Sequence, residues 1–344
     1  MRATIKDIAR ETHLSPSTVS LVLNNKPHRL SEETRKRVLE TAKRLDYRPN
    51  RMAASLVTNR TRTIGIVVAD IKNAYFVELA SGAEAKCTDM GYSLIICNTN
   101  DQREKDFDYI NLMIDRGVDG IIISFSAGVE EETAQKVTAY VRKFGIRAVA
   151  IDYMTDFSHV MNVRLDNKLG GYLATKHLID LGHRRVGCIT GPINNDTCTA
   201  NLRLLGYKSA LREAGIRGTA EWIAYGDFHI DSGYRQAGRL VKQGVTGIFA
   251  SNDLIAYGVY KWAREQAVDI PERISVVGYD DIAYSDFFSP GLTTVHQPAF
   301  DMGYKAAEKI IENLMYPDKK IERTTIYEPR LVVRESTKIL GQKP

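Results

Sequence analysis

The sequence lacks the features of membrane and secreted proteins. None of its apolar runs approaches the roughly 20 residues that a membrane-spanning helix needs. Its first eight residues alternate polar and apolar side chains and hold no apolar signal core, which predicts a chain that is not secreted. The cysteines form no Cys-x-x-Cys pair and stand at no zinc spacing from histidine; they are Cys87, Cys97, Cys188 and Cys198. We therefore expect reduced thiols, a cytoplasmic protein, and no metal or other cofactor.

Familiar catalytic motifs are also missing. The chain holds no P-loop, no Gly-x-Ser-x-Gly elbow and no Gly-x-Gly-x-x-Gly after a predicted strand. Residues 124–128 come nearest to the elbow but lack its first glycine. An enzyme acting on a sugar or nucleotide is therefore disfavoured, and the missing signal segment disfavours a transport-type binding protein.

Positive charge is concentrated at one end of the chain. Residues 1–60 hold thirteen Lys or Arg against six Asp or Glu, a net charge of +7. The remaining 284 residues hold thirty-four against thirty-six, a net charge of −2. A compact basic head on a near-neutral body predicts docking on polyanionic nucleic acid through the head.

The pattern of the basic head predicts three short helices. Thr4, Ser15 and Ser31 are each placed to cap one of them, and Pro16 takes the first position of the second helix. Apolar stripes follow at helical spacing, and in the third helix they are Val38, Leu39, Ala42 and Leu45. Two short helices joined by a turn at residues 11–14 and supported by a third make a helix-turn-helix. A small helical bundle with a solvated charged face is the alternative. The net charge and the small or polar outward residues of the second helix disfavour it; they are Pro16, Ser17, Thr18, Ser20, Leu21 and Asn24.

Several stretches resemble a known family. They are Thr4 to Ala9, Ser15 to Ser20 with Asn24, Ser31 to Arg35, Tyr47 to Asn50 continuing through Ala53 to Leu56, and Ile64 to Ile66. On these residues the chain resembles the lactose-repressor/galactose-repressor family of bacterial transcription regulators, essentially over its whole length. Residues 92–99 and 226–228 are most similar to the ribose-repressor and purine-repressor branch.

The resemblance implies a DNA interface. The second helix would lie in the major groove, and residues 50–56 would form a hinge helix that enters the minor groove as a pair from two subunits. Leu56 would then pry open a central base step, although it also fits a core leucine. A helix of two turns is too short to be stable alone, so we expect it to order on DNA. The implied contact residues are Thr4, Ser15, Pro16, Ser17, Thr18, Ser20, Leu21, Asn24, Asn50, Arg51, Ala53, Ala54 and Leu56.

Three residues of the head depart from the family pattern. His13 stands in the turn where the family usually has glycine, and histidine tolerates a positive φ better than bulky residues do. Leu21 replaces an Arg or His and offers only apolar contacts, for example to a thymine methyl, while Pro16 has no donor for reading bases. The preferred operator is therefore expected to differ from those of relatives.

The body alternates short apolar runs with helical segments. Runs at 64–69, 92–97, 120–124 and 148–152 predict strands, with helices at 76–89 and 104–116. The rhythm restarts with strands at 163–166, 185–190, 247–250 and 275–279, and helices at 170–181, 204–214 and 255–266. This pattern predicts an α/β fold of two doubly wound parallel-sheet lobes, which the family resemblance equates with periplasmic sugar-binding proteins.

The resemblance also implies where the domains divide. We expect a helix-turn-helix head at 1–48, a hinge helix and linker at 49–62, and an effector-binding and dimerisation core at 63–344. The chain would cross between lobes near Ser158, Ser289 and Asp318. The N-lobe would then hold about 63–158 and 290–318, and the C-lobe about 159–289 and 319–344, with residues 296–298 leading back into the N-lobe.

Ligands of doubly wound sheets bind beyond the carboxyl ends of the strands. The residues there combine aromatic rings with carboxylates, amides and one arginine, which suits a polyhydroxylated ring. Asp152, Asp253 and Asp280 also fit loop caps, and Phe228 fits a core residue. By resemblance the effector-binding residues are Asn73, Tyr75, Phe76, Ser124, Asp152, Tyr153, Arg203, Phe228, Asn252, Asp253, Asp280 and Gln297.

These features together predict a regulator that is not an enzyme. We expect a homodimer that binds a near-palindromic double-stranded operator and no membrane, as a repressor controlled by a small molecule. A sugar such as ribose is favoured as the effector, and a purine or a sugar phosphate is the alternative.

Overall fold

The computed structural model describes residues 3–23, 30–47, 60–153 and 160–341. It divides into two units, Met1–Thr61 and Arg62–Pro344, each of which is considered by itself. Asn24, Asn50, Arg51, Ala53, Ala54 and Leu56 lie outside the described residues. No helix among the described residues is long and apolar enough to cross a membrane.

The first unit contains three helices, α1 (Ile5–Thr12), α2 (Pro16–Leu23) and α3 (Glu32–Arg44). The Ser15 hydroxyl accepts the backbone N–H of Thr18 at 3.1 Å, and the Ser31 hydroxyl accepts that of Thr34 at 3.2 Å. Both contacts satisfy a free N–H group in the first turn of a helix. The start of α1 is tied differently, because the Asp7 carboxylate accepts both the backbone N–H and the hydroxyl of Thr4.

A small core holds these three helices together. Its buried residues are Ile8, Ala9, Val19, Val22, Val38 and Ala42. The prediction that Leu39 faces inward is wrong: its side chain is 47% exposed, because the inward stripe of α3 runs through Val38 and Ala42. His13 ends α1 in the left-handed region with φ 55°, as expected for a residue in the position of a glycine.

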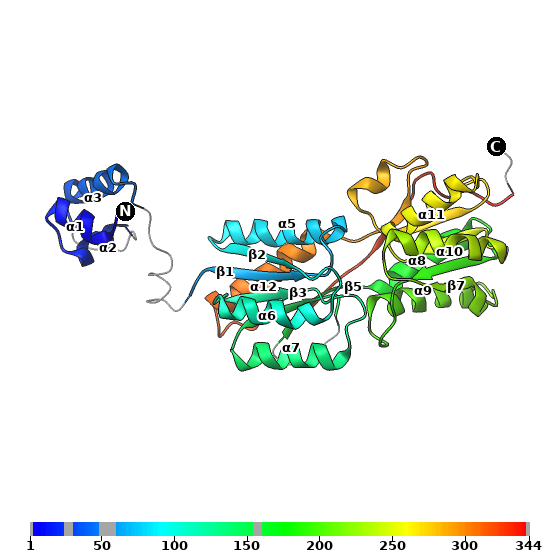
Figure 1. The fold of residues 1–344 in the computed structure, drawn as a ribbon, viewed down its shortest axis with the longest axis horizontal. Helices are drawn as coiled ribbons and strands as arrows, with labels where there is room; N and C mark the ends of the chain where they lie inside the picture. Colours follow the sequence, from blue (N-terminus) through cyan, green and yellow to red (C-terminus); the bar gives the residue numbers. More distant parts are fainter. Residues whose placement is uncertain (1–2, 24–29, 48–59, 154–159, 342–344) are drawn as a thin grey trace. The chain divides into compact units, whose positions relative to one another are not determined.

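The second unit contains two lobes, each built on a six-stranded sheet (Figure 1). The N-lobe sheet has the order β11-β5-β4-β3-β1-β2 and all its neighbours are parallel. Its helices cover both faces, with α5 and α12 on one side and α6 and α7 on the other. The elements are β1 (Thr63–Val68), α5 (Ala74–Asp89), β2 (Ser93–Asn98), α6 (Glu104–Asp115), β3 (Gly120–Ile123), α7 (Glu131–Lys143), β4 (Arg147–Ile151), β5 (Val160–Leu165), α12 (Ala299–Met315) and β11 (Thr324–Tyr327).

The C-lobe sheet has the order β12-β10-β9-β8-β6-β7, and only β12 runs antiparallel to its neighbour. Helices α8 and α9 pack on each other, as do α10 and α11. The elements are α8 (Asn167–Asp180), β6 (Val186–Thr190), α9 (Thr199–Glu213), η1 (Ala220–Trp222), β7 (Ile223–Tyr225), α10 (Ile230–Lys242), β8 (Gly247–Ala250), α11 (Asp253–Glu265), β9 (Ser275–Asp280), η2 (Ala283–Asp286), β10 (Thr293–His296) and β12 (Arg330–Val332).

The chain crosses between the lobes later than the sequence predicted. Strand β5 belongs to the N-lobe, because it pairs with β4, so the first crossing follows Leu165 rather than Ser158. Strand β10 pairs with β9 in the C-lobe, which moves the second crossing from Ser289 to the segment after His296. Strand β11 pairs with β5, so the third crossing follows Tyr327 rather than Asp318. A strand beside a crossing is adjacent in sequence to both lobes, and its apolar pattern does not reveal which sheet it joins.

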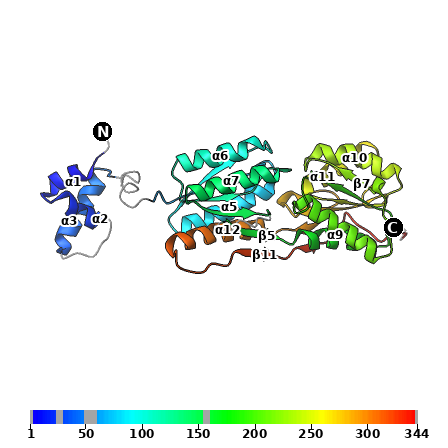
Figure 2. The same cartoon turned by 90° about the horizontal axis from the view of Figure 1, so that it is seen from below.

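Helix α12 packs on α5 although more than two hundred residues separate them (Figure 2). Gly82 and Gly303 make this approach possible. A Cβ atom on Gly82 would lie 1.9 Å from the Phe300 carbonyl oxygen, and one on Gly303 would lie 1.9 Å from that of Leu79. The close packing of α5 and α12 holds α12, which follows the crossing after His296, on the N-lobe.

Candidate functional site

A cavity of about 130 Å³ lies between the two lobes of the second unit. It opens where the strands of both sheets end, as expected for doubly wound folds. Eleven of the twelve predicted effector residues line it: Asn73, Tyr75, Phe76, Ser124, Asp152, Tyr153, Arg203, Phe228, Asn252, Asp280 and Gln297. Two of these residues, Asn73 and Asn252, directly precede α5 and α11. The side chain of each accepts a backbone N–H from the first turn of its helix, and this hydrogen bond fixes its position.

Asp253 is the exception and does not line the cavity. Its side chain is fully buried and accepts hydrogen bonds from the Thr294 hydroxyl at 2.6 Å, the Ser285 hydroxyl at 2.6 Å and the backbone N–H of Ile282 at 3.0 Å. Burial raises its pKa to about 6 despite these donors. Asp253 was predicted to contact the effector because it lies at the start of α11, near the end of a strand. Its hydrogen bonds instead connect α11 to other segments of the C-lobe.

Arg203 lines the cavity with only 5% of its surface exposed. Its Nε donates to Asn167 Oδ1 at 2.8 Å and its Nη1 donates to the Ser251 carbonyl at 2.6 Å. The guanidinium also lies over the Tyr279 ring, 3.7 Å from the centroid. These contacts fix the plane of the guanidinium, so that its position does not depend on a ligand.

Asp280 also lines the cavity and lies beside Arg203. Its Oδ1 lies 3.8 Å from Arg203 Nη1 and accepts Gln297 Nε2 at 2.6 Å. Burial raises the pKa of Asp280 to about 7, although the guanidinium acts in the opposite direction. The other end of the Gln297 amide, Oε1, is buried and has no hydrogen-bond partner among the described residues. An acceptor in this state beside a cavity is available to a ligand that donates a hydrogen bond.

Asp152 brings the N-lobe side of the wall together. One of its oxygens accepts the backbone N–H of Leu165 at 2.8 Å and Asn167 Nδ2 at 3.3 Å, and the other accepts the Tyr75 hydroxyl at 3.3 Å. Because Asn167 begins α8 in the C-lobe, this carboxylate spans the first crossing between the lobes. Its pKa is raised, chiefly by burial.

Aromatic side chains supply the apolar surface of the cavity. Tyr75 and Phe76 meet edge to face with ring centroids 5.1 Å apart, and Phe125 and Tyr153 form a tilted pair at 4.7 Å. Asn252 Nδ2 donates to the carbonyl of Phe228 at 2.9 Å and so positions that ring. Phe125 was missed by the sequence reasoning, although it directly follows Ser124 at the end of a predicted strand.

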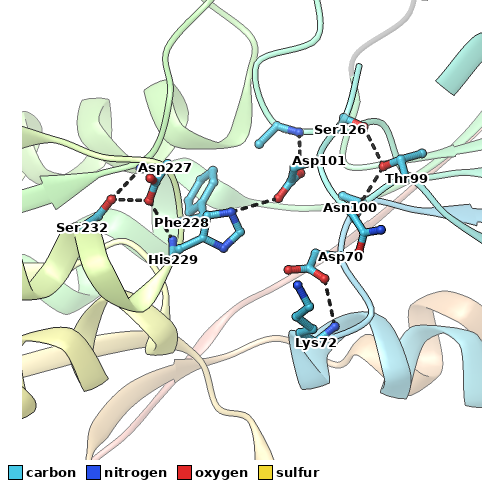
Figure 3. Close-up of polar contacts among 12 residues, drawn as sticks. Asp70, Lys72, Thr99, Asn100, Asp101, Ser126, Asp227, Phe228, His229 and Ser232 are labelled. Atoms are coloured by element: carbon cyan, nitrogen blue, oxygen red, sulfur yellow. Dashed lines mark hydrogen bonds and ion pairs between the residues drawn. The ribbon is translucent and has the colours of Figure 1, made fainter. Parts of the chain in front are cut away.

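Two further cavity residues were also missed, and they lie on opposite lobes. Asp101 follows β2 in the N-lobe, and His229 directly precedes α10 in the C-lobe. The Asp101 carboxylate lies 3.6 Å from His229 Nε2 (Figure 3). The sequence gave only a weak indication that they belong to the site: Asp101 follows a predicted strand, and His229 follows the predicted effector residue Phe228.

The predicted DNA-contacting residues of the first unit lie on its outer face. Thr4, Ser15, Pro16, Ser17 and Leu21 are exposed, and Thr18 and Ser20 are half-buried. The Ser15 hydroxyl lies 2.8 Å from the hydroxyls of both Ser17 and Thr18. These small groups leave the start of α2 narrow enough to approach a groove.

A helix-turn-helix unit joined in one chain to a two-lobed ligand-binding fold defines the class of ligand-responsive DNA-binding regulators. The chain matches the description "Bacterial regulatory proteins, lacI family" over residues 4–50 and "Periplasmic binding protein-like domain" over residues 175–337. It is 37% identical to the HTH-type transcriptional repressor PurR of Photobacterium profundum over 98% of this chain and 100% of that protein. The chain therefore belongs to the LacI family and is a DNA-binding transcriptional repressor, not an enzyme.

Solved structures agree with this assignment. A LacI family transcriptional regulator from Enterococcus faecium with bound ribose matches with a TM-score of 0.72 and 31% identity, over 81% of this chain and 100% of that one. The lac repressor dimer bound to operator and the anti-inducer ONPF matches with a TM-score of 0.86, over 98% of this chain and 100% of that one. At 24% identity the second match establishes the fold alone.

Proposed function

We propose that this protein is a cytoplasmic, homodimeric repressor whose operator affinity is set by a sugar bound in the cavity between its lobes. Two heads would engage the two halves of a near-palindromic operator, since operator symmetry mirrors protein symmetry. Effector binding would shift the balance between two arrangements of the lobes and so change the spacing of the hinge segments.

The proposed DNA interface combines groove and backbone contacts. Pro16, Ser17 and Leu21 would face base edges, whereas Thr18, Ser20 and Asn24 would hold phosphates and fix the register. Thr4 and Ser15 would complete the contacts of the head. The segment Asn50, Arg51, Ala53, Ala54 and Leu56 would occupy the minor groove.

The observation that carries the sugar proposal is the surplus of acceptors around the cavity. Asp152 and Asp280 present carboxylates, and Gln297 presents an amide oxygen with no partner among the described residues. Arg203 is the principal donor, but two of its nitrogens are already engaged. A sugar can donate a proton from each of its hydroxyl groups, and aromatic rings cover the apolar face of its ring. A volume of about 130 Å³ suits a single ring, because a cavity of about 150 Å³ accommodates benzene.

A purine is the second candidate effector. The similarity to repressors named PurR favours it, and so do the adjacent rings of Tyr75 and Phe76, which can pack on a planar base. However, a purine base carries several ring nitrogens that accept hydrogen bonds, whereas Asp152, Asp280 and Gln297 present acceptors that match the hydroxyl donors of a sugar. A sugar phosphate is a weaker alternative, because the carboxylates of Asp152 and Asp280 would repel its negative charge.

Thermal unfolding of the full chain against a panel of pentoses, hexoses, disaccharides and purines tests the proposal. A monosaccharide, ribose first, should raise the midpoint in a concentration-dependent way, because a ligand that binds only the folded state stabilises it. Stabilisation by a purine base and by none of the sugars would contradict the proposal. Effects of the active compound on operator affinity would then establish the direction of regulation.

A further inference from the structure

Three potential metal ligands, which line the cavity but are not among the proposed effector residues, converge on one another (Figure 3). Asp70 follows β1, Asp101 follows β2, and His229 precedes α10. One ligand atom from each lies within 4.8 Å of the other two. Two of these residues belong to the N-lobe and the third belongs to the C-lobe.

The two carboxylates are held in place, and among the described residues the only basic side chain within ion-pair distance of either is His229. One oxygen of Asp70 accepts the backbone N–H of Lys72 at 3.1 Å, and one oxygen of Asp101 accepts that of Ala127 at 3.0 Å. Asp70 is only 6% exposed and forms no ion pair within the described parts of the chain. Buried carboxylates are normally paired with a cation or bound to a metal. The negative charge of Asp70 also contributes to the raised pKa of Asp101, which is due mainly to burial.

The surroundings of His229 leave its ring free to act as a ligand. Asp227 accepts the backbone N–H of His229 at 3.1 Å and also pairs with Ser232 and Arg235. The nearest anionic partner of the ring is Asp101, which lies across the cleft. The imidazole therefore faces the two carboxylates and stands on the opposite lobe.

We propose that Asp70, Asp101 and His229 bind a divalent transition-metal ion such as Mn²⁺ or Zn²⁺ and thereby link the two lobes. One imidazole and two carboxylates suit Zn²⁺, which is a borderline ion, and also Mn²⁺, which prefers oxygen ligands. Zinc bonds to these groups measure about 2.0–2.2 Å, so ligand atoms around one tetrahedral ion lie roughly 3.4 Å apart. The ligand atoms of the observed cluster lie within 4.8 Å of one another and must therefore approach by up to about 1.4 Å.

Metal binding would favour the closed arrangement of the lobes, because the ligands come from both sides of the cleft. A metal and an effector that both favour this arrangement must strengthen each other's binding. This linkage rests on the proposed effector role of the cavity, whereas the metal site does not.

Metal titration of the chelator-treated full-length protein, without effector or DNA, tests the site. Mn²⁺ is followed by electron paramagnetic resonance, because carboxylate and imidazole bind it and thiols bind it poorly. The wild type should bind one equivalent. Asp101→Asn, Asp70→Asn and His229→Gln should each weaken binding about tenfold or more.

Asp231→Asn is the matched control, since Asp231 is an exposed carboxylate two residues from His229 and outside the cluster. It should bind Mn²⁺ as the wild type does. Circular dichroism checks the fold of each variant, and three separate ligand variants keep the test decisive if one of them fails to fold. Absence of stoichiometric binding by the wild type, or equal affinity in all variants, would overturn the site while leaving the proposed sugar effector untouched.

Discussion

Arg203 connects several parts of the cavity wall. It joins α9 to α8 through Asn167, to the end of β8 through the Ser251 carbonyl, and to Asp280 by charge. Removing one member of a buried charged pair leaves the other uncompensated, at a cost of about 3–5 kcal/mol. The residue therefore has a structural role as well as its proposed contact with an effector.

Arg203→Ala should abolish the response of operator binding to the effector while leaving basal operator affinity within about twofold of the wild type. The expected cause is loss of the fixed donor, and the measurement is operator titration with and without effector. Arg212→Ala provides the control, because Arg212 lies on the same helix and is exposed. A folded Arg203→Ala protein with a normal response would show that the effector binds elsewhere.

Asp106 makes a separate prediction about pH. It is fully buried, and the backbone N–H and hydroxyl of Ser126 both donate to it. Burial raises its pKa to about 7, so between about pH 4 and 7 the folded state holds a proton that the unfolded chain has lost. Stability must then fall as the pH rises through this window, by at most about 1.4 kcal/mol per unit.

Asp106→Asn should remove this contribution. The melting temperature of the wild type should fall relative to that of the variant as the pH rises from 4 to 7. Asp280 and Asp253 also have raised pKa values, but they contribute equally to both proteins and cancel in the difference. Asp108→Asn, an exposed substitution on the same helix, should follow the wild type. Parallel curves for the wild type and Asp106→Asn would contradict the assignment.

At the scale of elements, the turn after α1 carries strain that can be relieved. His13 adopts φ 55°, which costs a non-glycine residue roughly 1–2 kcal/mol. His13→Gly should therefore stabilise the head by about 0.5–1 kcal/mol after the added freedom of the unfolded chain is subtracted. Amide hydrogen exchange across residues 4–45 of the full-length protein measures this, and His13→Ala should show no gain. If exchange were slower than in the wild type for both His13→Gly and His13→Ala, or for neither of them, backbone strain at His13 would be contradicted.

The sequence predicted the bounds of helices and strands better than it predicted which strands pair with one another. Strands with four or more consecutive apolar residues, such as β1 and β3, were found within one or two residues of their expected bounds. Strand β5 was also recognised, but it was assigned to the wrong lobe, because its pairing with β4 and β11 decides its sheet and its own apolar pattern does not reveal those partners. Leu39 was misplaced for a related reason: local periodicity defines a stripe only to within one residue.

The site was predictable where the chain passes the ends of strands. Arg203 and Asp280 lie in the cavity wall as expected, since their motifs follow the topology of the fold. Asp253 shares the same pattern but points into the C-lobe, and nothing in its local sequence distinguishes the two outcomes. Asp101 and His229 were not foreseen, because only the approach of the two lobes brings them together.

For the whole molecule, the cavity is made by both lobes at once. Tyr75 and Asp152 come from the N-lobe, whereas Arg203 and Asp280 come from the C-lobe. A ligand that contacts all four has an affinity that depends on how the lobes are arranged. If the arrangement also sets the spacing of two heads, effector and operator must influence each other through it.

The coupling should be equal in both directions. If the effector changes operator affinity by a given factor, a saturating operator must change effector affinity by the same factor, which is about 5–150-fold for typical couplings of 1–3 kcal/mol. Two titrations measure this: operator at zero and saturating effector, and effector by calorimetry with and without operator. Non-specific duplex should leave effector affinity nearly unchanged, because phosphate contacts alone do not order two hinge segments in a groove. Unequal factors at equilibrium would show that a further ligand takes part, and an equal effect of non-specific duplex would separate the effector response from operator recognition.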